Sequence, residues 1–312
     1  MGNPTDLDMS AKKRAVAVLS VISNSTLIAI KLVAGFFTGS VAIISEAIHS
    51  FLDLMAAMMA WGAVRVSENP PDYDHPFGHG KTENFSALFE AILIVVGGGL
   101  ILKEAIAGVI KGQPLPDLKI GLVVMLLSTV VNYFISRRLF QVAKASDSEA
   151  LTADAWHLRT DVYSSLGVFL ALGFIEVGRL IAPELDLSFV DSLVAGLVAV
   201  LIVKTGLILG WDAAQGLGDK TLPDEEIQLI VKSVQNLYPA IQGFRRLRTR
   251  RSGPYRHILV DLLVDEGQTV GRAHELGVQF ALEVQAHFSK TDVTFHLEPT
   301  KPYLVINDDL RA

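Results

Sequence analysis

The chain of 312 residues contains no cysteine and comparatively few charged residues. The absence of cysteine excludes disulfides, thiolate nucleophiles, zinc fingers and iron–sulfur clusters, so any metal ion must be held by His, Asp and Glu. Charged residues make up 19% of the chain, against about one-quarter in an ordinary soluble protein. A net charge of -6 gives no support for nucleic-acid binding. Hydrophobic residues are abundant instead, at 50%, and the mean hydropathy is +0.40.

Hydrophobic runs long enough to span a bilayer fill the chain between about residues 15 and 210. A membrane-spanning helix needs about 20 mainly apolar residues, and six segments meet or approach that length. The first starts at Ala15 and is too long for the apolar region of a signal peptide, so we expect it to be retained. The sequence predicts an α-helical membrane protein with six transmembrane helices, at 15–38, 41–64, 86–110, 118–136, 153–181 and 188–211.

Lysine and arginine gather on one side of these six segments. Loops rich in Lys and Arg stay in the cytoplasm. We therefore expect a multi-pass protein of the inner (plasma) membrane with both termini in the cytoplasm. The residues on the expected cytoplasmic side are Lys12, Lys13, Arg14, Arg65, Lys81, Arg137, Arg138 and Lys144, and the short loops of the other side carry Lys111, Lys119 and Arg179.

The tail beyond residue 219 has the composition of an ordinary soluble domain. Pro223 followed by three acidic residues is typical of a helix start, and Ser252-Gly253-Pro254 is typical of a turn between strands. The order of elements predicts a ferredoxin-like, metallochaperone-like α-β-β-α-β domain. The expected elements are a helix at 222–237, strands at 244–250 and 256–264, a helix at 270–288 and a strand at 292–298.

Two of the expected spans carry the same pair of ionisable residues. His49 and Asp53 lie four residues apart in the second span, and His157 and Asp161 repeat that spacing in the fifth. Four residues are just over one helical turn, so each pair projects from one face of its helix. Two such helices facing each other would supply two imidazoles and two carboxylates, a tetrahedral set that suits zinc. The alternative is two helix-locking hydrogen bonds, which does not explain why both pairs are alike.

With these pairs, the chain resembles the cation diffusion facilitator family of divalent metal–proton antiporters. The loop Asp72-Tyr73-Asp74-His75-Pro76-Phe77-Gly78-His79-Gly80-Lys81-Thr82-Glu83 and the segment Arg248-Thr249-Arg250-Arg251-Ser252-Gly253-Pro254 are similar to signatures of that family. The resemblance implies a secondary active transporter, not an enzyme. It implies a homodimer that exports a divalent metal cation from the cytoplasm in exchange for protons. The expected parts are a cytoplasmic segment 1–14, a transmembrane domain 15–211, a linker 212–218 and a cytoplasmic metal-binding and dimerisation domain 219–312.

The resemblance also suggests the transported metal. It maps the transport site onto His49, Asp53, His157 and Asp161. Members with histidine at the position of His49 are similar to the zinc-selective branch, and two imidazoles favour zinc over hard cations. Zinc is therefore expected as the transported and regulatory ion. Ferrous iron, cobalt or cadmium remain alternatives, as does a membrane metal sensor or assembly protein that has lost transport.

The resemblance implies two further features near the membrane surface. Asp72, His75 and His79 match positions of a loop metal site between the second and third spans. Lys81 and Asp219 match a charge pair that links this loop to the start of the tail at the dimer seam. Otherwise the loop is a solvated surface, and the charge pair is worth less than about 1 kcal/mol.

A third metal site is implied in the tail, at Asp261, His274, His296 and Glu298. His296 and Glu298 alternate along one expected strand and share a face. Arg245 and Asp261 stand where relatives carry histidine, so we expect fewer metal ions than in a full two-metal tail. His257 and His287 are expected to be ordinary surface residues. The arginines between 245 and 251 are expected to face anionic membrane lipids or to complete charge pairs, not to bind nucleic acid.

Overall fold

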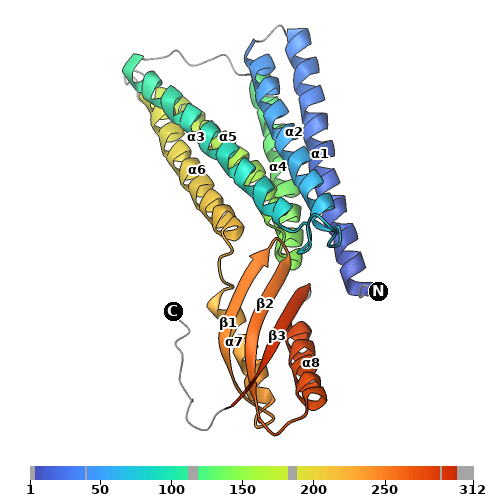
Figure 1. The fold of residues 1–312 in the computed structure, drawn as a ribbon. Coiled ribbons are helices and arrows are strands. Elements are labelled where there is room, and N and C mark those ends of the chain that lie inside the picture. The colour runs from blue at the N-terminus through green and yellow to red at the C-terminus, as the bar shows by residue number, and fades with distance from the viewer. Residues whose placement is uncertain (1–3, 39–40, 112–118, 182–187, 289, 301–312) are drawn as a thin grey trace. The chain divides into compact units, whose positions relative to one another are not determined.

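A computed structural model describes residues 4–38, 41–111, 119–181, 188–288 and 290–300. The chain forms two compact units, Met1–Ala214 and Gln215–Ala312. The first is helical and the second combines helices with a sheet (Figure 1).

Six long helices make up the described part of the first unit. Each contains or nearly contains one of the six expected spans, and most extend beyond the apolar run because hydropathy marks only the part of a helix that is apolar. By length and composition, three stretches of the described residues could cross a membrane: Asp8–Val33, Lys81–Ile110 and Ser192–Leu217. The six helices are α1 (Pro4–Thr38), α2 (Val41–Ser67), α3 (Lys81–Lys111), α4 (Lys119–Ser146), α5 (Glu149–Ile181) and α6 (Ser188–Leu217).

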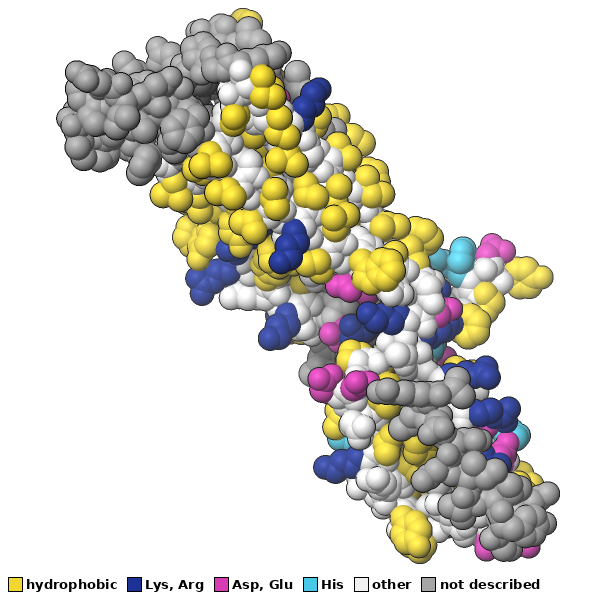
Figure 2. Space-filling view, turned by 90° about the vertical axis from the view of Figure 1, so that its left-hand side faces the viewer, with side chains coloured by type: hydrophobic (Ala, Val, Ile, Leu, Met, Phe, Trp, Pro, Cys, Tyr) yellow, Lys and Arg dark blue, Asp and Glu magenta, His cyan; other side chains and the backbone are white. Residues whose placement is uncertain are grey.

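Hydrophobic side chains cover much of the described surface on the face of the helical unit that Figure 2 shows. Phe36 on α1, Val96 and Leu100 on α3, and Trp211 on α6 are each more than half exposed. A soluble protein rarely exposes so large an apolar surface, whereas lipid tails would cover it. The surface thus agrees with a membrane location.

Small residues let the helices approach closely. α1 packs against α2 and α4, α4 packs against α5, and α3 packs against α2 and α5. The buried core between them is rich in alanine, as expected where lipid-embedded helices gain contact through close approach. Its buried members are Ala17, Val64, Leu139, Ala143, Ala150, Leu151, Ala155 and Leu158.

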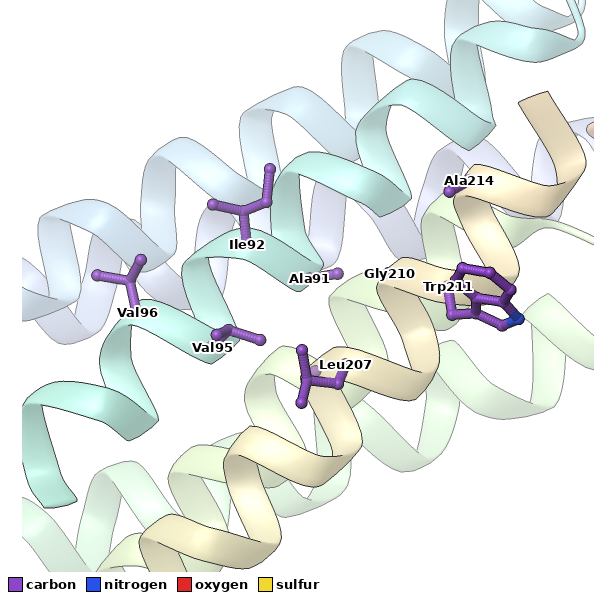
Figure 3. A pocket seen from close by; sticks show the side chains of 9 residues that line it. Ala91, Ile92, Val95, Val96, Leu207, Gly210, Trp211 and Ala214 are labelled. Carbon is purple, nitrogen blue, oxygen red and sulfur yellow. The ribbon is translucent and has the colours of Figure 1, made fainter. Parts of the chain in front are cut away.

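α3 and α6 cross at glycines. A Cβ at Gly98 would lie 2.8 Å from Val203, and one at Gly206 would lie 2.8 Å from Val95, so any side chain at either position would force the helices apart. Beside this crossing the two helices border an apolar groove, in which Trp211 lies at one end (Figure 3). The groove carries no chemistry of its own because every residue that lines it is apolar.

The second unit confirms the expected α-β-β-α-β order (Figure 1). The strand order is β1-β2-β3, with β1 antiparallel to β2 and β2 parallel to β3. Both helices contribute buried residues to one core with β2, including Ile230, Phe280 and Leu262. The elements are α7 (Asp224–Asn236), β1 (Ile241–Ser252), β2 (Tyr255–Val264), α8 (Val270–His287) and β3 (Thr291–Pro299).

Alternation along β2 decides which side chains reach the open face of the sheet. Ile258, Val260 and Leu262 are buried in the core with the helices. Leu259 and Asp261, one residue out of phase, must point to the opposite face. This face carries the candidate metal ligands of the tail.

Candidate metal centres

The helical packing brings Asp53, His157 and Asp161 together inside the first unit. Asp53 lies on α2, the two others lie on α5, and these helices are in contact. His157 Nε2 lies 3.0 Å from Asp53 Oδ1. One ligand atom from each of the three residues lies within 4.8 Å of the others. His157 and Asp53 are both less than a tenth exposed. Two carboxylates and one imidazole nitrogen therefore converge inside the bundle, and together they can hold a cation.

His49 stands one helical turn before Asp53 on α2, on the same face of the helix. Its side chain lies outside the described residues. The fourth ligand of the transport site therefore stays a prediction.

A turn in the loop between α2 and α3 brings Asp72, His75 and His79 together. The oxygens of Asp72 lie 3.5 Å from His75 Nδ1 and 3.2 Å from His79 Nε2. Gly78 has φ +81° and donates its N–H to the carbonyl of His75 at 2.9 Å, which closes the turn between the two histidines. The backbone N–H of His75, at 2.7 Å, lowers the pKa of Asp72, so this carboxylate stays charged and can bind a cation.

In the tail, the open face of the sheet gathers Asp261, His296 and Glu298, with ligand atoms within 4.8 Å of one another. Asp261 and His296 are partners in the parallel register of β2 and β3. Arg246 occupies the same cluster: it donates to Asp261 and, at 3.1 Å, to Glu298. The bond to Asp261 raises the pKa of Arg246. The cluster is therefore charge-compensated without a metal ion.

A β-bulge explains why Arg246, in addition to Arg245, reaches this cluster. Arg245 is the register partner of Asp261, and its Nη1 lies 3.7 Å from Glu298 Oε2. The register shifts between Arg245 and Arg248, and Arg246 has φ +45°. An extra residue at such a bulge breaks the alternation of side chains, so Arg246 can project toward the same face of the sheet as Arg245. Sequence alternation alone missed Arg246 for this reason.

Two of the tail histidines differ from expectation. His274 is not brought to the cluster: it is exposed on α8 and its ring centroid lies 5.8 Å from that of Phe295, on the helix side of the sheet. The expectation that His257 is a surface residue was wrong, because it is 5% exposed and lies 3.3 Å from Asp292. Burial lowers the pKa of His257. His287 is exposed, as expected.

Arginines of β1 complete charge pairs. Arg250 donates to Asp219 at 3.1 Å, and Arg251 lies 3.4 Å from Glu226. The Lys81–Asp219 pair stays a prediction, because the two residues belong to different units.

A cluster of Lys13, Ser67, Glu83 and Ser148, hereafter the clasp, was missed by the sequence analysis. Glu83 Oε1 accepts hydrogen bonds from Lys13 Nζ and Ser67 Oγ, each at 2.7 Å, and Oε2 accepts one from Ser148. All four side chains are buried. The clasp joins α1, α2 and α3 to the residue before α5. The available signal was the position of Lys13 and Glu83 close to expected spans, where ionisable groups are costly.

Comparison with known proteins decides the family. Residues 17–217 match the cation efflux transmembrane domain, and residues 222–300 match the cytoplasmic domain of cation efflux proteins. The chain belongs to the cation efflux family. Members of this family are transporters, so the chain is a multi-pass membrane transporter of cations and not an enzyme.

Curated relatives in the cation efflux family match along nearly the whole chain. The cation-efflux pump FieF of Klebsiella pneumoniae is 31% identical over 284 residues, which cover 91% of this chain and 92% of the relative. FieF of Escherichia coli is 31% identical over 283 residues and 91% of both chains. Among solved structures, the metal-bound C-terminal domain of the CzcD transporter from Thermotoga maritima is 31% identical, covers 25% of this chain and 94% of its own, and has a TM-score of 0.23.

Proposed function

We propose that the protein exports zinc from the cytoplasm in exchange for protons, through the site formed by Asp53, His157, Asp161 and His49. The observation that carries this proposal is the convergence of the first three side chains from α2 and α5 inside the helical unit. With His49 the set has two imidazole and two carboxylate ligands, which suits tetrahedral zinc. The cation-efflux relatives support export as the direction of transport.

Alternating access would move the metal across the membrane. Spans rock around the site, so that it opens first to the cytoplasm and then to the outside. In the inward-facing state, deprotonated ligands capture the metal ion. In the outward-facing state, protons compete for the same ligands, since unperturbed histidine titrates near about pH 6.5. Because metal and protons share their ligands, exchange needs no separate proton path.

The loop and tail clusters are proposed as additional metal sites with different strengths. Asp72, His75 and His79 already face one another, so the loop can bind zinc as it stands. The tail cluster holds Arg246, so a metal ion there must displace a guanidinium before it reaches Asp261. We therefore expect weak regulatory binding in the tail.

The protein is proposed to work as a homodimer with both termini in the cytoplasm. The match of residues 222–300 to the family's cytoplasmic domain supports dimerisation through the tail. Lys81 and Asp219 would then link the loop to the tail near the dimer seam. Anionic lipids are the expected neighbours of the lysines and arginines at the cytoplasmic ends of the helices.

Zinc uptake into everted membrane vesicles with an acidic interior tests the function. Uptake should require the proton gradient and disappear in Asp161→Ala. Asp212→Ala, which removes an exposed carboxylate from α6, is the matched control and should transport normally. Gradient-independent accumulation would contradict proton exchange. Preferential uptake of ferrous iron, cobalt or cadmium over zinc would select the alternative substrate, and zinc binding without uptake of any metal would indicate a sensor.

A further inference from the structure

Two carboxylates inside the helical bundle, Glu90 and Asp154, are not accounted for by the transport site. Glu90 lies on α3, Asp154 lies on α5, and neither side chain has any exposed surface. Ser86 Oγ lies 3.4 Å from Glu90 Oε1. Within the described residues, Glu90 Oε2 and both carboxylate oxygens of Asp154 have no hydrogen-bond partner. Such groups are costly to bury unless something satisfies them.

The clasp contains a buried carboxylate with a structural role, Glu83, which can be compared with Glu90. Glu83 is as deeply buried as Glu90, yet it accepts hydrogen bonds from an ammonium group and two hydroxyls. Glu90 and Asp154 have no comparable set of donors among the described residues.

Helix geometry places these carboxylates at one level. α1, α3 and α5 run in the same direction (Figure 1). Ser20 follows Lys13 by seven residues, and Glu90 follows Glu83 by seven. Asp154 follows Ser148 by six. Seven residues are close to two turns, so Ser20 and Glu90 lie on the clasp's side of their helices about 10.5 Å deeper, and six residues place Asp154 at a similar depth, about 9 Å along α5. We call this set the oxygen layer.

Contacts agree with this placement. Ser20 lies beside Asp154, and Glu90 is within electrostatic range of both Asp154 and His157. Ser20 Oγ is fully buried and has no hydrogen-bond partner among the described residues. Its hydroxyl oxygen is directed at the Asp154 carboxylate and meets no further polar group among the described residues. α2 runs in the opposite direction and reaches this level near Ala60, which is fully buried and contributes only a methyl group.

We propose that Ser20, Glu90 and Asp154 form a second intramembrane site for a divalent metal ion, an intermediate stop between the clasp end of the bundle and the transport site. The inference rests on the proposed transport function. Asp154 precedes His157 by three residues, or about 4.5 Å along α5. Oxygen ligands alone hold zinc less tightly than a set with imidazoles. A weak site beside a stronger one lets an ion enter and move on.

Zinc binding to the purified full-length protein tests the site without transport. The background carries Asp53→Ala and Asp161→Ala, so that the transport site is removed. Bound zinc per subunit is measured by equilibrium dialysis at saturating zinc. Adding Glu90→Gln and Asp154→Asn should remove one zinc ion per subunit. Adding Glu104→Gln, which changes an exposed carboxylate of α3, should remove none.

Zinc flux in proteoliposomes provides the second measurement. With the transport site intact, Glu90→Gln or Asp154→Asn should raise the zinc concentration for half-maximal flux by about tenfold or more. Glu104→Gln should leave it unchanged. An unaltered zinc stoichiometry in the binding experiment overturns the proposal.

The two experiments separate this proposal from the proposed function. If the wild-type protein shows no zinc flux, the transport function fails, and the dialysis experiment still decides whether the oxygen layer binds zinc. If the double variant does not assemble, as judged by size-exclusion chromatography, either single variant carries the same expectation because one carboxylate cannot hold the ion.

Discussion

Replacing Lys13 by methionine should destabilise the helical unit far more than the same change at Lys12. The two lysines are neighbours on α1, so local helix propensity is matched. Lys13 is fully buried and its Nζ lies 2.7 Å from Glu83 Oε1. Lys12 pairs with Asp8 one turn away, and both of these side chains are more than half exposed.

The expected changes in the free energy of unfolding follow from how deeply each ion pair is buried. An exposed ion pair contributes about 0–1 kcal/mol, so Lys12→Met should change the free energy of unfolding by no more than that. Removal of one partner from a buried pair costs about 3–5 kcal/mol, because the other charge stays buried and uncompensated. Ser67 and Ser148 would still donate to Glu83, so we expect about 3 kcal/mol for Lys13→Met. Methionine retains most of the packing of the lysine stem.

Unfolding of the detergent-purified protein by SDS, followed through the helical circular dichroism, measures these free energies. The double variant Lys13→Met, Glu83→Gln should recover much of the lost stability because it removes both charges. Equal effects of Lys12→Met and Lys13→Met would refute the reasoning, as would a double variant less stable than Lys13→Met alone.

Four further predictions concern the metal centres and the tail. Asp53→Ala or Asp161→Ala should reduce zinc flux in proteoliposomes to background while size-exclusion chromatography still shows a dimer. His49→Asp should raise the ratio of cadmium to zinc flux, because it adds a hard, charged ligand; an unchanged ratio would place selectivity elsewhere. In the tail fragment 219–312, Arg246→Ala should strengthen zinc binding by calorimetry about tenfold, whereas Arg246→Lys should not. The lowered pKa of His257 means that the unfolded tail binds its proton first, so this residue makes thermal stability fall as pH drops below 6.5, and His257→Gln should flatten that dependence.

Much of the fold follows from the sequence because its patterns are local. Apolar length predicts each helix of the first unit, and the polar ends of α4 and α5 escape detection only because hydropathy cannot distinguish a polar helix from a loop. In the tail, the Ser252-Gly253-Pro254 turn and the acidic start at Asp224 mark element ends to within a few residues. Tertiary packing does not override these signals.

Some residues of the candidate sites can be predicted from local sequence spacing, whereas others depend on tertiary structure. Asp53, His157 and Asp161 were predictable because each His–Asp spacing is a helical repeat within one span. Arg246 was not, because its direction depends on a β-bulge that breaks alternation. His257 looked like a surface residue because its burial depends on the parallel partner strand β3, where Asp292 lies at its register position.

The oxygen layer cannot be predicted from the sequence alone, but one tertiary contact is enough to set the relative depth of its residues. Glu83 and Ser148 carry no repeat that relates them, and neither do Glu90 and Asp154. Once the hydrogen bond from Ser148 to Glu83 sets the level of α3 against α5, the rise of 1.5 Å per residue places Glu90 and Asp154 at similar depths. The same count carried three residues beyond Asp154 reaches His157. Ser148, just before α5, and Asp154 and His157 on α5 therefore lie at successive levels, and the donors available to each buried carboxylate decide whether it locks the bundle or is left to bind a cation.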